Sequence, residues 1–222
     1  MTGLPSDSGI GTSTLSDALD RLGLSGQPVG LRPAGSATRL WGPAYTIRMM
    51  PAAVPAGSVG DYVDDVPPGA IVVLDNAGRM DGTVWGDLLT TTAGLRGIGG
   101  TVINGVCRDS WVLTEQDYPL YSLGVHMRTG KDRVQLEAVQ VPVALGDVRV
   151  EPGDLVVGDR DGVVVIPAAY VERVLAAAAE IEAAEEAIRA AVRNGSSLRE
   201  ARVQQNYHAL QSRVRADAGG AG

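Results

Sequence analysis

Two short strings in this sequence carry residue types that could bind a small carboxylate together with a metal ion. Gly86-Asp87-Leu88-Leu89 is typical of a helix start, where backbone N–H groups without intrahelical partners can bind an anion. Arg108-Asp109 follows a short apolar run and offers one cation and one oxygen ligand. We therefore expect a site for a small carboxylated substrate that is built from both strings.

Each residue of the two strings has an expected role. The amides of Leu88 and Leu89 would point at a carboxylate, and Asp87 could contact a metal-bound water as well as cap its helix. Asp109 would bind Mg²⁺ or Mn²⁺, because magnesium commonly keeps several waters and takes only one or two carboxylates. Arg108 could hold a carboxylate or an enolate through paired hydrogen bonds.

Both strings also have an ordinary structural interpretation. Gly86-Asp87-Leu88-Leu89 could be no more than a helix cap followed by two core leucines. Arg108 and Asp109 could form a surface ion pair, with Asp109 starting the next helix. The residues of the two strings do not by themselves decide between these interpretations.

The histidines and the cysteine exclude some other chemistry. His126 and His208 are the only two histidines, so a zinc site with three histidine ligands cannot form within one chain. We expect His126 to be structural, with a place in the pocket wall as the alternative. We expect His208 to be solvated or at a subunit contact, and Cys107 to be a small buried residue.

Other polar positions are expected to serve the fold. Asp75 and Asp81 are placed like turn or strand-end residues. Arg128-Thr-Gly-Lys131 is too short for a phosphate-binding loop and lacks its spacing.

Composition limits the class of protein. The 222 residues include 19 basic and 26 acidic ones, a net charge of −7, which argues against a nucleic-acid-binding surface. A single cysteine cannot form an intrachain disulfide and suits a reducing compartment, and we expect no signal peptide. The longest apolar stretches, such as Gly162–Ile166, are too short to span a bilayer. We expect a cytoplasmic protein without nucleic-acid or membrane partners.

Helices and strands alternate along the first part of the chain and predict an α/β fold. The spacing of apolar residues predicts a first helix at 12–22. Further runs predict strands at 44–50, 70–74, 101–104 and 120–123, with helices at 58–64, 86–96 and 110–116. Strand–helix–strand units cross over right-handedly and bind ligands beyond the carboxyl ends of their strands. Arg108 and Asp109 lie near such an end.

The pattern changes after Lys131. Short strands at 139–145, 148–150, 154–157 and 162–167, separated by turn signals, predict an antiparallel β unit. An alanine-rich helix follows from 168 to about 193, and Ser196 is expected to cap a last helix that reaches about residue 216. We predict a catalytic domain at 12–167 and a helical extension at 168–217 that packs on the core or on a neighbouring subunit.

Four strings resemble the RraA-like family. They are Val84-Trp-Gly-Asp-Leu-Leu-Thr90, Gly97-Ile-Gly-Gly-Thr-Val-Ile-Asn-Gly-Val-Cys-Arg-Asp109, Val141-Pro-Val143 and Pro152-Gly-Asp-Leu-Val-Val-Gly-Asp-Arg-Asp-Gly-Val-Val-Val-Ile-Pro167. The family includes class II 4-hydroxy-4-methyl-2-oxoglutarate/4-carboxy-4-hydroxy-2-oxoadipate aldolases, which also decarboxylate oxaloacetate, and the regulator of ribonuclease E activity. The resemblance runs from about Thr14 to Ile166, and the spacing of Gly-Asp-Leu-Leu and Arg-Asp is similar to the aldolase branch.

The resemblance implies an α/β core with swivelling β/β/α character, assembled as a homotrimer or homohexamer with sites between subunits. It places the divalent metal on Asp109 and the substrate, with its developing enolate, on Arg108. It also implies that the amides of Leu88 and Leu89 bind the pyruvyl carboxylate beside Gly86, and that Asp87 orders metal-bound water. The implied reaction breaks the C3–C4 bond of a 4-hydroxy-2-oxo acid and releases pyruvate.

Two departures from the family pattern concern the far end of the substrate. Gly124-Val-His-Met127 stands where relatives often have a Ser-Pro pair. The C-terminal extension leaves open which acidic residue could come from a neighbouring subunit; the candidates are Glu180, Glu182, Glu185 and Glu186.

Two other functions stay open at this point. One is a non-catalytic regulator of ribonuclease activity that acts by protein–protein contact, and the other is a lyase for a different 2-oxo or hydroxy acid. The paired anion and metal ligands favour an enzyme over a pure regulator, since a regulator has no need of them.

Overall fold

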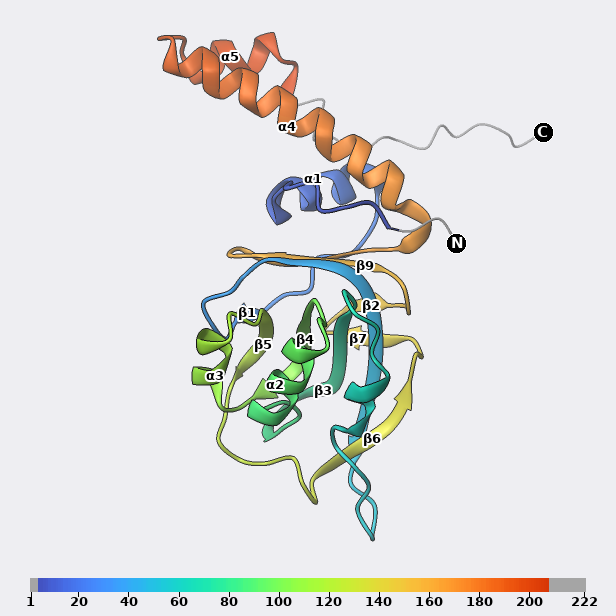
Figure 1. Ribbon diagram of the computed structural model, residues 1–222. Coiled ribbons are helices and arrows are strands. Elements are labelled where there is room, and N and C mark those ends of the chain that lie inside the picture. The colour runs from blue at the N-terminus through green and yellow to red at the C-terminus, as the bar shows by residue number, and fades with distance from the viewer. Residues whose placement is uncertain (1–3, 208–222) are drawn as a thin grey trace, which may run out of the picture. The chain divides into compact units, whose positions relative to one another are not determined.

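Four parallel strands form the middle of the larger sheet in the computed structural model, which describes residues 4–207 (Figure 1). They lie in the order β5 (Leu120–Val125), β4 (Gly100–Cys107), β3 (Ile71–Thr83) and β2 (Leu40–Pro51). Every residue of β4 is buried, as expected of a parallel strand that is covered on both faces. Because β3 and β4 run parallel, their carboxyl ends lie at the same edge of the sheet.

Antiparallel strands extend this parallel centre. The long strand β2 pairs with β9 (Leu155–Asp159) near its start and with β6 (Val134–Val139) near its end. β10 (Gly162–Ile166) adds to β9, and β1 (Arg32–Pro33) adds to β5 at the opposite edge. β7 (Val143–Leu145) and β8 (Val148–Val150) form a separate hairpin. The predicted antiparallel strands after Lys131 are therefore present. β6 and β9 pair with β2, whereas β7 and β8 pair only with each other.

Helices pack on one face of the sheet, and further β-strands pack on the other. Alternating residues of β3 divide between two cores, with Val72 and Leu74 in one and Ile71 and Val73 in the other. The first core is completed by α2 (Asp87–Leu95), α3 (Ser110–Glu115) and the 3₁₀ helix η1 (Asp61–Asp65). The second is completed by residues of the β7–β8 hairpin and of β9 and β10. This β/β/α layering confirms the predicted α/β class.

The described chain divides into two compact units, of which the first contains the sheet and ends at Ala168. The second unit comprises Gly9–Ser25 and the chain from Ala169 onward, with the helices α1 (Thr12–Leu22), α4 (Val171–Arg193) and α5 (Leu198–Gln204); the 3₁₀ turn η2 (Ala168–Tyr170) precedes α4.

Side-chain contacts hold α1 to α4 within the second unit. Thr14 Oγ1 donates to Glu182 Oε2 at 3.2 Å, and Arg21 Nη1 donates to Glu180 Oε2 at 2.7 Å. The predicted first helix thus shares a unit with the C-terminal helices, while the predicted domain limits at 12–167 and 168–217 stay predictions. Among residues 4–207, no helix is long and apolar enough to cross a membrane.

Two predicted strands have different limits in the structure. The strand predicted at 70–74 continues to Thr83, because β3 resumes its pairing with β4 after two register shifts. The first lies between Asp75 and Arg79, where Ala77 (φ 53°) and Gly78 (φ 68°) have left-handed backbones, and the second lies between Arg79 and Thr83. The strand predicted at 139–145 is two strands, β6 and β7, because Gln140 has a φ of 55° that no regular strand accommodates.

The helix caps also differ from the prediction. Gly11 is the N-cap of α1 and provides no side-chain hydrogen bond; the helix itself begins at Thr12, as predicted. Ser197, not Ser196, caps α5, because its hydroxyl and the Glu200 carboxylate exchange hydrogen bonds with each other's backbone amides. This helix is predicted to reach about residue 216, but α5 ends at Gln204, and Asn206 just beyond it has a φ of 49° that a helix does not accommodate.

Asp154 offers a test of how the β9 end of the first unit is held. Its buried carboxylate accepts hydrogen bonds from Glu151 N at 2.8 Å and from Ala168 N at 2.9 Å. We expect Asp154→Ala to lower the free energy of unfolding by about 2–3 kcal/mol, because two amides lose their acceptor. Urea denaturation measures this change.

The matched control is Asp147→Ala, which removes an exposed carboxylate from the turn between β7 and β8. We expect this control to change stability by less than about 0.5 kcal/mol. An equal loss of unfolding free energy in the two variants would show that the hydrogen bonds of Asp154 do not stabilise the fold.

Candidate functional site

The two strings singled out in the sequence meet where α2 begins beside the end of β4. Arg108 N donates to Trp85 O at 2.9 Å, which joins the residue after β4 to the segment before α2. Asp87 N donates to Asp109 Oδ2 at 3.3 Å, and Arg108 Nε lies 3.4 Å from the same oxygen. One carboxylate therefore contacts both the helix start and the arginine.

Gly86 makes this close approach possible. A Cβ at this position would lie 2.8 Å from Asp109 Oδ2 and 3.1 Å from Arg108 Nε. Gly86 is also the N-cap of α2, and Asp87 is the first residue of the helix. The expectation that Asp87 caps the helix is therefore wrong, because its side chain makes no cap hydrogen bond.

The start of α2 is held by a buried tryptophan. Trp85 Nε1 donates to Thr90 Oγ1 at 2.9 Å, and its ring stacks on Tyr118 with centroids 6.1 Å apart. Thr90 in turn donates to Gly86 O from both its backbone N–H and its hydroxyl, each at 3.0 Å. The amides of Leu88 and Leu89 lie in this first turn, where no intrahelical carbonyl can accept from them.

Asp109 has an uncommon backbone conformation. Its φ is 54° and its ψ 41°, in the left-handed region that aspartate and asparagine tolerate better than most residues. It occupies the N-cap position of α3 but makes no side-chain cap hydrogen bond. The carboxylate contacts the start of α2 instead. The ion pair with Arg108 and the place of Asp109 at the start of α3 agree with the ordinary structural interpretation, and the contact with α2 is added to it.

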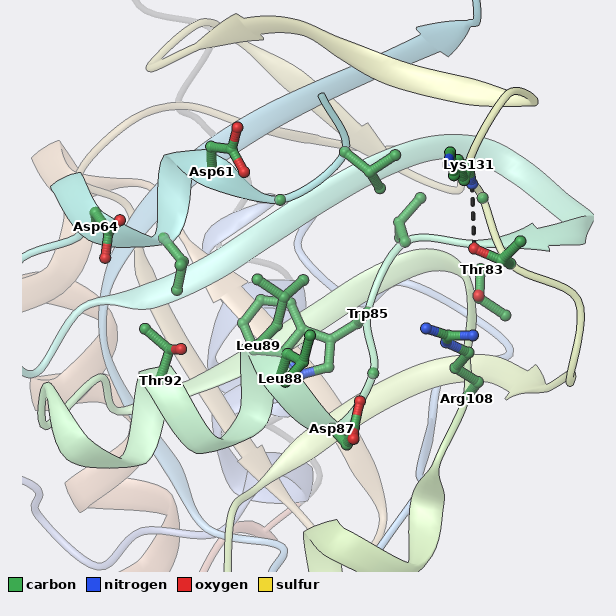
Figure 2. Close-up of a pocket in the computed structure, with 17 residues that line it drawn as sticks. Asp61, Asp64, Thr83, Trp85, Asp87, Leu88, Leu89, Thr92, Arg108 and Lys131 are labelled. Carbon is green, nitrogen blue, oxygen red and sulfur yellow. Dashed lines mark hydrogen bonds between the residues drawn. The ribbon is translucent and has the colours of Figure 1, made fainter. Parts of the chain in front are cut away.

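A pocket of about 370 Å³ opens in front of the start of α2 (Figure 2). The segment Trp85–Leu89 and Arg108 form part of its wall, and residues of η1, β3 and the loop before β6 complete it. Leu88 is 77% exposed and is therefore no core residue, whereas Leu89 is partly buried against the first core, so the alternative of two core leucines is wrong for Leu88 alone. Asp109 is not among the described lining residues; it contacts the pocket wall through Arg108 and the amide of Asp87.

The donor set fits a hard cation that keeps most of its water. Within residues 4–207, no three His, Cys, Asp or Glu side chains cluster closely enough to hold a metal, so a site made wholly of such ligands is absent from that part of the chain. Asp109 is 32% exposed, and no described residue donates to its Oδ1. One carboxylate plus water and substrate is an arrangement that magnesium commonly accepts.

The other singled-out residues lie outside the pocket wall. His126 Nδ1 accepts from Arg128 N at 3.1 Å, a local turn contact in keeping with the structural role expected of it. Asp81 pairs with Arg79 at 3.1 Å, and Asp75 accepts from Ala144 N at 3.1 Å beside the β3 bulge.

The remaining candidates concern contacts with a neighbouring subunit and stay predictions. The four glutamates considered as acids from a neighbouring subunit lie on α4, where they pair with Arg21, Arg189 and Arg193. His208 lies outside the described residues.

Three charged pocket residues are not predicted by the sequence patterns. Lys131, Asp61 and Asp64 line the pocket, although Lys131 belongs to a string whose spacing does not fit a phosphate loop. The two aspartates come from η1, which lies before β3 in the chain. No local spacing links any of the three to Arg108, so only the folded chain brings them to one pocket.

The fold and site define an α/β protein in which a helix start and Arg108 line one pocket, and Asp109 contacts both of them from outside the pocket wall. The family model described as RraA-like: Aldolase/RraA matches residues 12–165, and the chain belongs to this family. The Legionella pneumophila protein DlpA is 37% identical over 194 residues, or 86% of this chain, but this chain spans only 32% of that protein's length. A Halalkalibacterium halodurans protein named "Putative 4-hydroxy-4-methyl-2-oxoglutarate aldolase" is 33% identical, over 80% of this chain and 82% of that protein.

Solved structures agree with the family assignment. An uncharacterized protein of Pseudomonas syringae pv. tomato superposes with a TM-score of 0.81 at 41% identity, over 87% of this chain and 92% of that one. Streptomyces coelicolor RraAS2, described as an unusual member of the RNase ES inhibitor RraA protein family, has a TM-score of 0.73 at 28% identity, over 80% and 90% of the two chains. The predicted RraA-like fold is confirmed.

Cys107 provides a chemical test of this part of the site. The thiol is fully buried at the end of β4, and burial raises its pKa, although Ser122 Oγ at 3.7 Å opposes the effect. We expect the native protein to react with Ellman's reagent about 100-fold more slowly than the urea-unfolded chain, because reaction needs an accessible thiolate. Comparable rates in the two states would show that the β4 end opens readily.

Proposed function

We propose that this chain is a Mg²⁺- or Mn²⁺-dependent lyase that cleaves a 4-hydroxy-2-oxo acid by retro-aldol reaction to release pyruvate, and that it also decarboxylates oxaloacetate. The observation that carries the proposal is the contact of Asp87 N with Asp109 Oδ2 at 3.3 Å, since it joins an anion-binding helix start to a carboxylate suited to a cation. The name of the Halalkalibacterium halodurans relative supports an aldolase-type lyase.

The residues of the pocket can divide the work of such a reaction. The amides of Leu88 and Leu89 would bind the 1-carboxylate of the substrate, because the positive end of the helix faces it. Arg108, partly exposed at the same end of the pocket, would stabilise the negative charge that develops on the 2-oxo oxygen. Because Gly86 has no side chain, the Arg108 guanidinium and the Asp109 carboxylate can both lie close to the start of α2.

Asp109 would hold the divalent cation, and Asp87 would orient water beside it. The cation, when bound, would supply a Lewis acid for the 2-oxo group. For the C3–C4 bond to break, the 4-hydroxyl gives its proton to water and its oxygen becomes the carbonyl of the departing oxo acid. The electron pair of the broken bond is then left on the enolate of pyruvate. Arg108 and the helix start keep that enolate in place until a proton from water reaches C3 and gives pyruvate. Asp87 lies on the pocket wall, in a position to orient this water.

The proposal also includes an oligomeric state, and it has one competing function. We infer a homotrimer or homohexamer, which light scattering on the purified chain would measure. The similarity to Streptomyces coelicolor RraAS2 keeps a regulator of ribonuclease activity as the competing function. A regulator would bind a ribonuclease in a pull-down and release no pyruvate.

The proposed activity has a direct assay. With Mg²⁺ or Mn²⁺ present, we expect pyruvate release from 4-hydroxy-4-methyl-2-oxoglutarate and from oxaloacetate, measured by coupling to lactate dehydrogenase. EDTA should abolish the release and added metal should restore it, because the 2-oxo group is not polarised once the metal is removed. No metal-dependent release from either substrate would refute the lyase assignment.

Two substitutions test the assigned residues. We expect Arg108→Ala and Asp109→Ala each to lower kcat/KM by at least about 100-fold, since each removes charge that stabilises the developing enolate or its cation. Arg160→Ala is the matched control, because Arg160 is exposed between β9 and β10 and lies outside the pocket wall. Near-normal turnover in both site variants, or equal loss in the control, would contradict the roles of Arg108 and Asp109.

A further inference from the structure

The pocket at the start of α2 continues along the helix beyond the groups that the proposed reaction uses. Asp87 and Arg108 line one end of the pocket, and Thr92, on the second turn of α2, lines the other. The helix rises about 7.5 Å between Asp87 and Thr92. Figure 2 shows Thr92, together with Asp61 and Asp64 of η1, on the side of the pocket away from Arg108. The pocket therefore has a second part, between α2 and η1.

The floor of this second part is apolar. We name it the α2–η1 groove, and its lining residues are Val59, Gly60, Val63, Leu89 and Thr92. The side chains of Val59 and Leu89 pack against the first core but are only partly buried, so apolar surface stays open in the groove. Burial of such surface by an apolar ligand is favourable, and ligand pockets are lined mainly in this way.

Two contacts hold the walls of the groove together. Gly60 lies so close to α2 that a Cβ added to it would be 3.0 Å from Leu89 Cδ2. Farther along the helix, the Arg96 guanidinium donates to Asp64 O, and its Nη1 lies 4.0 Å from Asp64 Oδ1. Because Thr92 and Arg96 are four residues apart, they share one face of α2. These contacts fix η1 against α2 along the groove.

The charges beside the groove decide what kind of group it accepts. Asp61 and Asp64 are exposed and line the pocket on the η1 side. The basic residues among the described pocket lining are Arg108 and Lys131, and Figure 2 shows both on the opposite side. A carboxylate in the groove would be repelled by the two aspartates. A cation would gain little from aspartates that are in water and would lose its own hydration over the apolar floor. An uncharged apolar group fits the groove best.

We propose that the α2–η1 groove binds an uncharged apolar substituent at C4 of the substrate that is longer than a methyl group. This inference rests on the proposed function, which places the 1-carboxylate of the substrate at the amides of Leu88 and Leu89. The side chain of Leu89 lines the groove, so a substituent on C4 can extend from the reacting carbons directly into it. The preferred substrates are then 4-hydroxy-2-oxo acids that carry an alkyl chain of several carbons at C4.

The prediction compares two substrates that differ only in the length of the C4 substituent. They are 4-hydroxy-4-methyl-2-oxoglutarate and its 4-butyl homologue, which is cleaved at the same C3–C4 bond to pyruvate and 2-oxohexanoate. We expect kcat/KM for the butyl substrate to be at least about tenfold higher, because its additional methylene groups leave water in the groove. An equal or lower kcat/KM for the butyl substrate would overturn the inference.

Thr92→Phe tests whether the groove is responsible for this preference. A phenyl group at position 92 fills the groove from the α2 side, so the ratio of kcat/KM between the butyl and methyl substrates should fall to about one. Thr91→Phe is the matched control, because Thr91 is exposed, does not line the pocket and loses only a hydrogen bond from Gln116. We expect the control to keep the ratio at about tenfold or more. An unchanged ratio in Thr92→Phe, or an equal fall in both variants, would overturn the inference.

Equilibrium binding separates this inference from the proposed function. 2-Oxopentanoate and 2-oxooctanoate lack the 4-hydroxyl and cannot undergo retro-aldol cleavage, so calorimetry with them needs no turnover. We expect 2-oxooctanoate to bind at least about tenfold more tightly with a more negative heat-capacity change, and Thr92→Phe to remove the difference. That result would support the groove even if the protein released no pyruvate. Equal affinity for the two ligands would overturn the inference even if the lyase activity were present.

Discussion

The contact between the Asp109 carboxylate and the first amide of α2 is the interaction on which the site depends. It holds the end of β4 against the start of the helix at 3.3 Å, and it is possible only because Gly86 has no side chain. The left-handed backbone of Asp109 turns its carboxylate toward α2 instead of capping α3. Aspartate tolerates this conformation better than most residues, and Asp117 and Asp132 have a positive φ as well.

The sheet explains why these groups can be held so closely. Parallel pairing of β3 and β4 brings the segments after both strands to one edge, which is where α/β sheets bind ligands. The stacked Trp85 and Tyr118 then fill the core beneath the helix start. The pocket is therefore lined by polar groups whose supports are buried and rigid, an arrangement that keeps catalytic or binding groups in position.

Much of the fold follows from local patterns. Continuous apolar runs predicted the parallel strands, and glycines and prolines predicted the later turns, because both signals act over a few neighbouring residues. The limits of two predicted strands were wrong, because pairing with a distant segment or an unusual backbone dihedral changed where the strand ends. β3 continues beyond Asp75 because Arg79 pairs with Gly105 and Thr83 pairs with Val106 of β4. The left-handed backbone of Gln140 divides one predicted strand into two.

The sequence by itself determined the family, the helix start at Gly86–Leu89 and the residue types of the Arg108–Asp109 pair, since these depend on short strings. The folded chain was needed to show that one carboxylate contacts both strings, that Gly86 rather than Asp87 caps the helix, and that Lys131 shares their pocket. These groups are far apart along the chain. Side chains on separate helices and strands become neighbours only when the sheet forms, and local residue spacing does not predict which of them will be in contact.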